Sequence, residues 1–66
     1  MFEYLFVLVN HDDKVLKVNG QGTGVFRSVS AYDFANEKGR EGWELAGVVG
    51  PHDHDQYKLI FRRYIQ

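Results

Sequence analysis

The sequence predicts one small α+β domain, residues 1–66, in which an antiparallel sheet of three to four strands carries a single helix on one face. Three observations lead to this fold class. Aromatic and β-branched residues run through 2–9, apolar residues recur at helical spacing within 31–38, and apolar residues alternate with a period of two after 43. The expected order is strand, a weaker candidate strand, helix, strand, strand.

The first strand is predicted at Phe2–Val9, because these residues favour extended backbone and a polar cluster follows them. Both faces of this strand are apolar, which is typical of a central strand covered on both sides. Val15–Val18 is the weaker candidate, and a turn over Asn10–Lys14 would make it a hairpin with the first strand.

The glycine-rich stretch Asn19–Gly24 is predicted to be a loop. Ser30 and Asp33 then have the spacing of a capping box with aspartate in place of glutamate, so a helix should begin near Ala31. Phe34 lies in its apolar stripe, with alanines beside it.

Residues 36–45, Asn-Glu-Lys-Gly-Arg-Glu-Gly-Trp-Glu-Leu, join the helix directly to the next strand. Gly39 is predicted either to allow close approach to the sheet or to begin the unwinding of the helix. Gly42 should supply the left-handed conformation of a helix stop, and Trp43 should anchor the core. Alternation then places Trp43, Leu45, Gly47 and Val49 on one face of the strand.

Residues 50–56 contain Pro51 and are predicted to form the turn before the last strand. Alternation separates the last strand into two rows. One row runs from Tyr57 through Phe61 to Ile65, and the other contains Lys58, Ile60, Arg62 and Tyr64.

Composition excludes several classes of function. The formal net charge is −1 and 44% of residues are hydrophobic, which is typical of a globular domain without the basic field of a nucleic-acid or membrane-binding protein. The chain has no cysteine, so disulfides and thiolate zinc sites are excluded. We expect a cytoplasmic protein that is not an enzyme and has no cofactor, no membrane contact and no nucleic-acid partner.

The double-sided strands predict self-association. One helix covers only one face of the sheet, so the other face would expose apolar side chains to water. A homo-oligomer, most simply a two-fold dimer, would cover them. The alternative is a monomer whose second face is shielded by the loop Asn19–Arg27.

Asn-Glu-x-Gly-x-Glu-Gly-Trp-Glu-Leu at 36–45, followed by Tyr57-x-x-Ile-Phe-Arg-Arg, resembles a bacterial family of very short proteins called domain of unknown function four-one-seven-seven. The likeness covers 31–63 well and 2–9 loosely. It implies a small α+β fold with Gly39, Gly42, Trp43 and Leu45 as structural residues, and it implies no reaction. The segment 10–30 departs from this pattern.

The turn at 52–55 is the sharpest chemical motif, because His52, His54 and Asp55 are ligand types suited to zinc, nickel or copper. The alternative interpretation is an ordinary polar turn, since two histidines do not complete a metal site. His11 is a further candidate ligand. With 15–18 as a strand, up-and-down tracing places the turn after the first strand and the turn at 50–56 at opposite ends of the sheet. A third ligand would then come only from a second chain.

Two other features are candidates for ligand or partner binding. The loop 20–24 departs from the dinucleotide-binding glycine pattern, so it is either a plain connection or a ligand-clasping loop with Arg27 as an anion partner. Lys58, Arg62 and Tyr64 form a basic and aromatic row that either meets an anionic ligand or is simply solvated. Glu41 and Glu44 bracket Trp43 but lack the partners of a catalytic set.

The sequence therefore favours a non-catalytic, self-associating module that binds a protein partner or a small ligand at a surface created by the oligomer. The alternative is a metal- or nucleotide-binding regulatory protein that uses the turn at 52–55 or the loop at 20–24.

Overall fold

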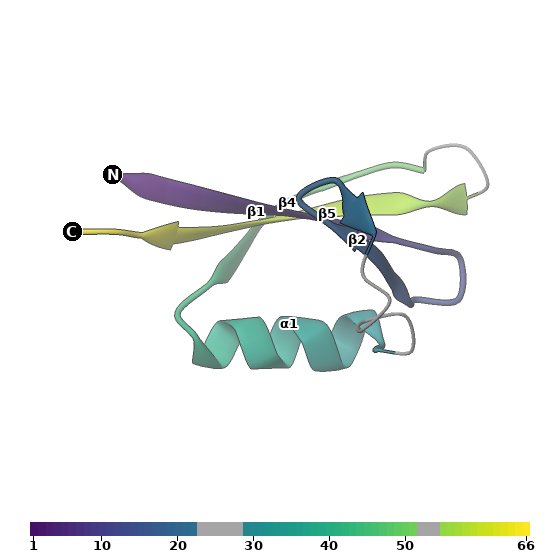
Figure 1. Cartoon of the computed structure of the whole chain (residues 1–66), viewed down its shortest axis with the longest axis horizontal. Helices are drawn as coiled ribbons and strands as arrows, with labels where there is room; N and C mark the ends of the chain where they lie inside the picture. The colour runs from purple at the N-terminus through teal and green to yellow at the C-terminus, as the bar shows by residue number, and fades with distance from the viewer. Residues whose placement is uncertain (23–28, 52–54) are drawn as a thin grey trace.

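The computed structural model describes residues 1–22, 29–51 and 55–66, and it confirms the α+β fold class. Figure 1 shows a sheet with a single helix on one side. The elements are β1 (Phe2–Val9), β2 (Val15–Val18), β3 (Gln21–Gly22), α1 (Ala31–Arg40), β4 (Glu44–Val49) and β5 (Tyr57–Tyr64). The candidate strand at 15–18 is present. The sheet has five strands rather than three to four, because two residues of the predicted glycine-rich loop pair with β2 as β3.

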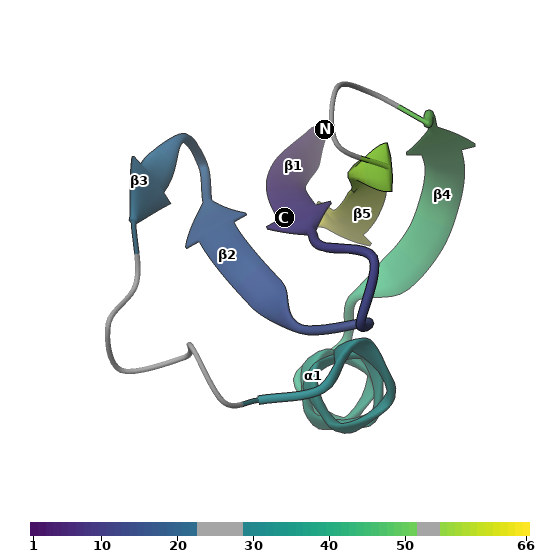
Figure 2. The same cartoon turned by 90° about the vertical axis from the view of Figure 1, so that its right-hand side faces the viewer.

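The sheet is antiparallel with the order β3-β2-β1-β5-β4, so β1 and β5 form its centre. These two strands pair along their whole length, from Phe2 opposite Tyr64 to Val9 opposite Tyr57. Figure 2 views the helix end-on, with β2 and β3 to one side of this pair and β4 to the other. The predicted central position of Phe2–Val9 is therefore confirmed.

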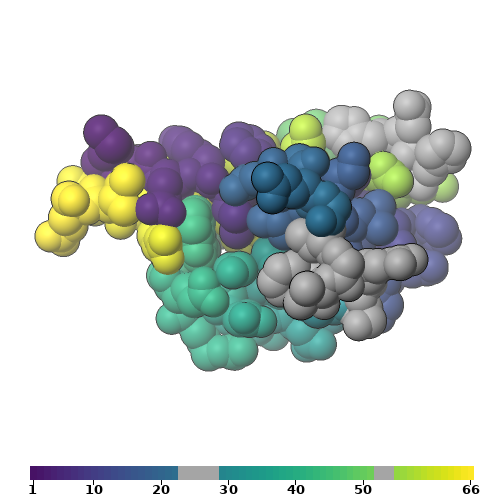
Figure 3. Space-filling view, viewed as in Figure 1, coloured from purple at the N-terminus to yellow at the C-terminus, as the bar shows by residue number. Residues whose placement is uncertain are grey.

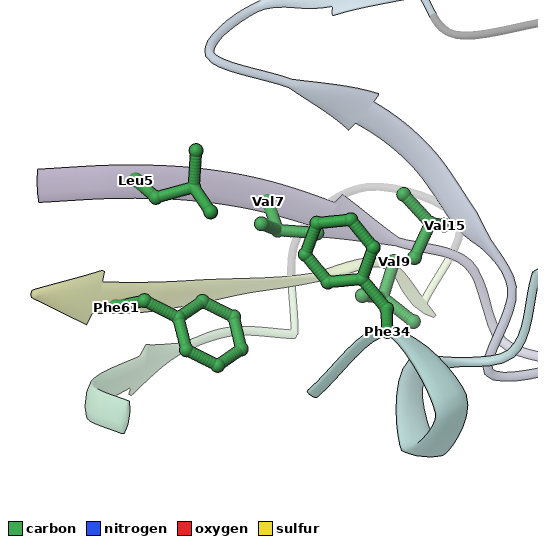
Figure 4. Close-up of a cluster of buried hydrophobic side chains, with 6 residues drawn as sticks. All are labelled: Leu5, Val7, Val9, Val15, Phe34 and Phe61. Atoms are coloured by element: carbon green, nitrogen blue, oxygen red, sulfur yellow. The ribbon is translucent and has the colours of Figure 1, made fainter. Parts of the chain in front are cut away.

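The hydrophobic core lies between the sheet and α1. Alternation along β1 directs every second side chain towards the helix, and Phe34 reaches back from α1 (Figure 4). The buried hydrophobic side chains of the described residues are Leu5, Val7, Val9, Val15, Phe34 and Phe61. Trp43 is half-buried and packs against this cluster, as predicted for an anchor.

The helix α1 begins at Ala31 as predicted, and the Ser30 half of the predicted capping box is present. Ser30 is the N-cap, and its Oγ accepts a hydrogen bond of 3.1 Å from the backbone N–H of Asp33. Because the first N–H groups of a helix have no partner within the helix, this contact satisfies one of them.

The end of α1 is a Schellman turn. The N–H of Gly42 donates to the Gly39 carbonyl at 3.1 Å, and the N–H of Trp43 donates to the Lys38 carbonyl at 2.9 Å. Gly42 has φ of 94°, which confirms the predicted left-handed stop. A Cβ at Gly39 would meet nothing within 4 Å, so the predicted close approach to the sheet is wrong. Gly39 lies within the last turn of α1, which continues to Arg40, and its carbonyl accepts one hydrogen bond of the Schellman turn.

The turn after β1 is organised by one side chain. Asn10 Oδ1 accepts hydrogen bonds of 2.9 Å from the backbone N–H groups of Asp12 and Lys14. Asp13 takes φ of 61°, a left-handed conformation that aspartate tolerates. This local network explains why the sequence turns at the predicted hairpin.

The position of that turn corrects one expectation. Val9 is opposite Val15 in β2 and opposite Tyr57 in β5. The turn after β1 and the connection into β5 therefore lie at the same end of the sheet, and the prediction of opposite ends was wrong. Up-and-down tracing did not include β3, and this extra strand reverses the direction in which β4 and β5 run relative to β1.

A β-bulge in β4 corrects a second expectation. Leu45 is opposite Phe61, on the helix side of β5, whereas Gly47 and Val49 pair with residues on the other side. Ala46 is the extra residue that reverses the alternation. The predicted common face for Leu45, Gly47 and Val49 is therefore wrong beyond Ala46, because a bulge leaves no trace in a simple period-two pattern.

Candidate functional site

The sheet face opposite α1 carries a row of exposed aromatic side chains, and we call it the open face. Phe2, Tyr4 and Phe6 of β1 are 41%, 50% and 43% exposed there, and Tyr64 beside them is 61% exposed. The residues that alternation and pairing place on the open face are Phe2, Tyr4, Phe6, Leu8, Lys17, Glu44, Gly47, Val49, Lys58, Ile60, Arg62 and Tyr64. Aromatic side chains of this size are normally buried or engaged by a partner.

One end of the open face is aromatic and internally paired. The rings of Phe2 and Tyr64 meet edge to face with centroids 5.5 Å apart. The Arg62 guanidinium lies 4.7 Å from the centre of the Phe2 ring, and its Nε donates to Glu44 Oε1 at 2.6 Å. In Figures 1 and 3 the first residues of β1 and the last residues of the chain project together past the end of the helix.

These contacts change the meaning of the predicted basic and aromatic row. Lys58, Arg62 and Tyr64 do share the open face, as the sequence indicated. However, the charge of Arg62 is already balanced by Glu44, so Arg62 and Tyr64 belong to the aromatic end. Lys58 lies at the other end, where the register places it opposite Leu8.

A pocket of about 730 Å³ occupies that other end, and we call it the lysine pocket. Its lining residues are Phe6, Leu8, Lys17, Gly20, Pro51, Gln56 and Lys58. Leu8 is flanked by a lysine on each neighbouring strand, because Lys17 pairs with it across β2 and Lys58 across β5. The volume lies within the range of about 300–1,000 Å³ that is usual for small-ligand sites.

Sequence reasoning did not identify Lys17 as a candidate. The residue lies in a short strand with no motif, and only its register against β1 brings it beside the predicted Lys58. The one available signal was the hairpin prediction itself, because a hairpin places residues of its two strands side by side.

On the helix side, Arg63 holds three elements together and was also not singled out. Its Nη2 contacts Glu3 Oε1 of β1 at 2.9 Å, and its Nη1 donates to the Glu41 carbonyl at the end of α1 at 3.1 Å. The guanidinium lies 4.3 Å from the centre of the Trp43 ring. Trp43 therefore stacks on an arginine of its own chain, which is a structural role.

Several predicted site residues lie outside the described part of the chain, namely Arg27, His52 and His54. Asp55 is described and exposed, with φ of 58°. Among the described residues, no group of three or more histidine, aspartate and glutamate side chains is placed to hold a metal ion. The metal and glycine-loop predictions remain predictions.

The two glutamates beside Trp43 are both engaged in ion pairs. Glu41 contacts Lys38 Nζ at 3.2 Å, and Glu44 contacts Arg62 as described above. Within the described ranges no helix is long and apolar enough to cross a membrane.

Comparison with known proteins gave no relative for this chain: no family model, curated protein or solved structure matched it. The resemblance to the family of very short bacterial proteins therefore remains an expectation based on the motif at 36–45.

Proposed function

We propose that this protein is a non-catalytic, self-associating module whose open face is covered by a second copy of the chain. The observation that supports the proposal is the row of exposed aromatic side chains Phe2, Tyr4 and Phe6 on the central strand β1. A 66-residue chain without cysteine buries a small core and gains most from a partner that covers such a row.

The dimensions of the open face suit a dimer. The eight residues of β1 span about 26 Å along the strand. Across the sheet, the four adjacent strands β2, β1, β5 and β4 span about 19 Å at the usual spacing. The footprint is therefore about 400–500 Å², since β2 and β4 are shorter than β1. This footprint is about half of the roughly 800 Å² that each partner contributes to a standard interface, and the side chains that stand up from the face add accessible area to it.

The charges on the open face favour one of two symmetric arrangements. A two-fold axis parallel to the strands would place the lysine ends of both copies over each other. Lys17 and Lys58 of one copy would then face the same two lysines of the other copy. An axis across the strands reverses the partner and places Lys58 of one copy over the aromatic end, near Tyr64, of the other. Like charges repel, whereas an ammonium group is attracted to the face of an aromatic ring. The axis across the strands is the arrangement that we propose.

Light scattering tests self-association directly. We expect a molar mass of twice the 7.7 kDa chain and expect Tyr4→Glu to reduce it to the monomer value, because a carboxylate would be buried in the interface. Tyr32→Glu is the matched control, since Tyr32 is 72% exposed on α1, away from the open face. A wild-type protein that stays monomeric at all concentrations would contradict the proposal.

Chemical cross-linking tests the axis. In a Lys58→Cys, Tyr64→Cys double variant the two thiols of one chain are about 20 Å apart along β5, and the wild-type chain contributes no cysteine. If the strands are reversed, a bismaleimide linker shorter than this separation should join two copies of the double variant but should not join two copies of either single variant. Efficient cross-linking of the Lys58→Cys single variant would show instead that the two lysine ends meet.

A further inference from the structure

The lysine pocket combines an apolar floor with two positive side chains. The ring of Phe6 and the side chain of Leu8 come from β1 and line the pocket. Lys17 and Lys58 line it from the two strands that flank β1, and the spacing of strands places their Cα atoms about 10 Å apart. Gln56 adds an amide that both donates and accepts hydrogen bonds.

The charges of these two lysines are not balanced within the described residues. Both other cations of β5 are paired, Arg62 with Glu44 and Arg63 with Glu3. Neither Lys17 nor Lys58 makes an ion pair with another described residue, and no described carboxylate lines the pocket. The chain as a whole has a net charge of −1, so the positive charge here is local.

From this arrangement we infer that the lysine pocket binds a small organic anion with a flat apolar body and a carboxylate group. The carboxylate lies between the ammonium groups of Lys17 and Lys58, and the apolar body covers Phe6 and Leu8. The ammonium groups supply charge-assisted hydrogen bonds, and the apolar body removes the exposed ring from water. A neutral compound of the same shape gains only the second contribution, so the site selects anions.

This inference does not depend on the dimer, because every lining residue comes from one chain. The proposed second copy would place its aromatic end over the same pocket. Ligand binding is therefore measured separately for the dimer and for a monomeric variant. Tyr4 does not line the pocket, and its Tyr4→Glu variant provides the uncovered form of the chain.

Titration with 2-naphthoate, followed by backbone amide chemical shifts, tests the inference in the wild-type chain and in Tyr4→Glu. We expect the largest shifts at Leu8, Lys17, Gly20 and Lys58. The neutral analogue 2-naphthamide should bind about tenfold more weakly. Lys17→Gln and Lys58→Gln should each weaken naphthoate binding by about fivefold, since each removes one partly exposed charge contact.

Arg40→Gln is the matched control. It removes one positive charge from the last turn of α1, on the other side of the sheet, and should leave the affinity unchanged. The inference is overturned if naphthoate and naphthamide bind equally well, if the lysine variants bind as tightly as the control, or if neither the wild-type chain nor Tyr4→Glu binds. Binding by Tyr4→Glu alone would support the pocket and show that a second copy occludes it.

Discussion

Replacing Phe34 by alanine should remove a large part of the stability of this fold. Phe34 is the buried residue of α1, with 1% of its surface exposed, and its ring centre lies 6.2 Å from that of Phe61. Truncating a buried phenylalanine costs about 3–5 kcal/mol, of which an aromatic pair contributes about 0.5–1.5 kcal/mol. A chain of 66 residues has a total stability of about 3–10 kcal/mol, so Phe34→Ala should lose about a third of it or more.

Urea unfolding followed by circular dichroism measures this loss at one fixed protein concentration, since self-association would add to the apparent stability. Phe34→Leu keeps most of the apolar volume and should lose about 1–2 kcal/mol, which keeps the measurement possible if the alanine variant does not fold. Tyr32→Ala, on the exposed side of the same helix, should change stability by less than about 0.5 kcal/mol. Equal losses for Phe34→Ala and Tyr32→Ala would show that α1 does not pack on the sheet through Phe34.

The two ends of α1 give two further predictions, both measured by the same unfolding experiment. Gly42→Ala should cost about 1 kcal/mol or more because φ is 94° there, whereas Gly39→Ala should stabilise by about 0.5–1 kcal/mol because this helical position is open. Changes of the same sign would contradict the Schellman turn. Ser30→Ala should cost about 1 kcal/mol through loss of the cap to Asp33, and an unchanged midpoint would show that this hydrogen bond is not formed.

The parts of the fold that sequence reasoning anticipated are those set by local chemistry. Ser30 caps the residue three positions on, and Gly42 stops the helix through its own backbone. Phe2–Val9 is apolar on both faces wherever its neighbours lie, so its place in the centre of the sheet was readable. The exposed aromatic face follows from the same pattern. Alternation along the last strand also put Lys58 among the candidate binding residues, and Lys58 lines the lysine pocket.

The features that were missed depend on which strands become neighbours. Ala46 forms a bulge only because Leu45 and Gly47 pair with successive residues of β5. Lys17 reaches the candidate site only because β2 and β5 flank β1 on opposite sides. Neither relation appears in the spacing of residues along the chain, because strand pairing joins segments far apart in sequence.

The sequence by itself determined four of the five strands, the helix with its cap and stop, the anchor Trp43 and the existence of a second apolar face, because each depends on side chains a few positions apart. It did not determine β3, which forms only by pairing with β2. The tertiary structure alone decided the strand order and the sheet face on which Val49 lies. It alone also placed the turn after β1 and the connection into β5 at the same end of the sheet. It also brought together the two lysines of the proposed binding site. Their strands, β2 and β5, do not pair with each other, but each pairs with β1.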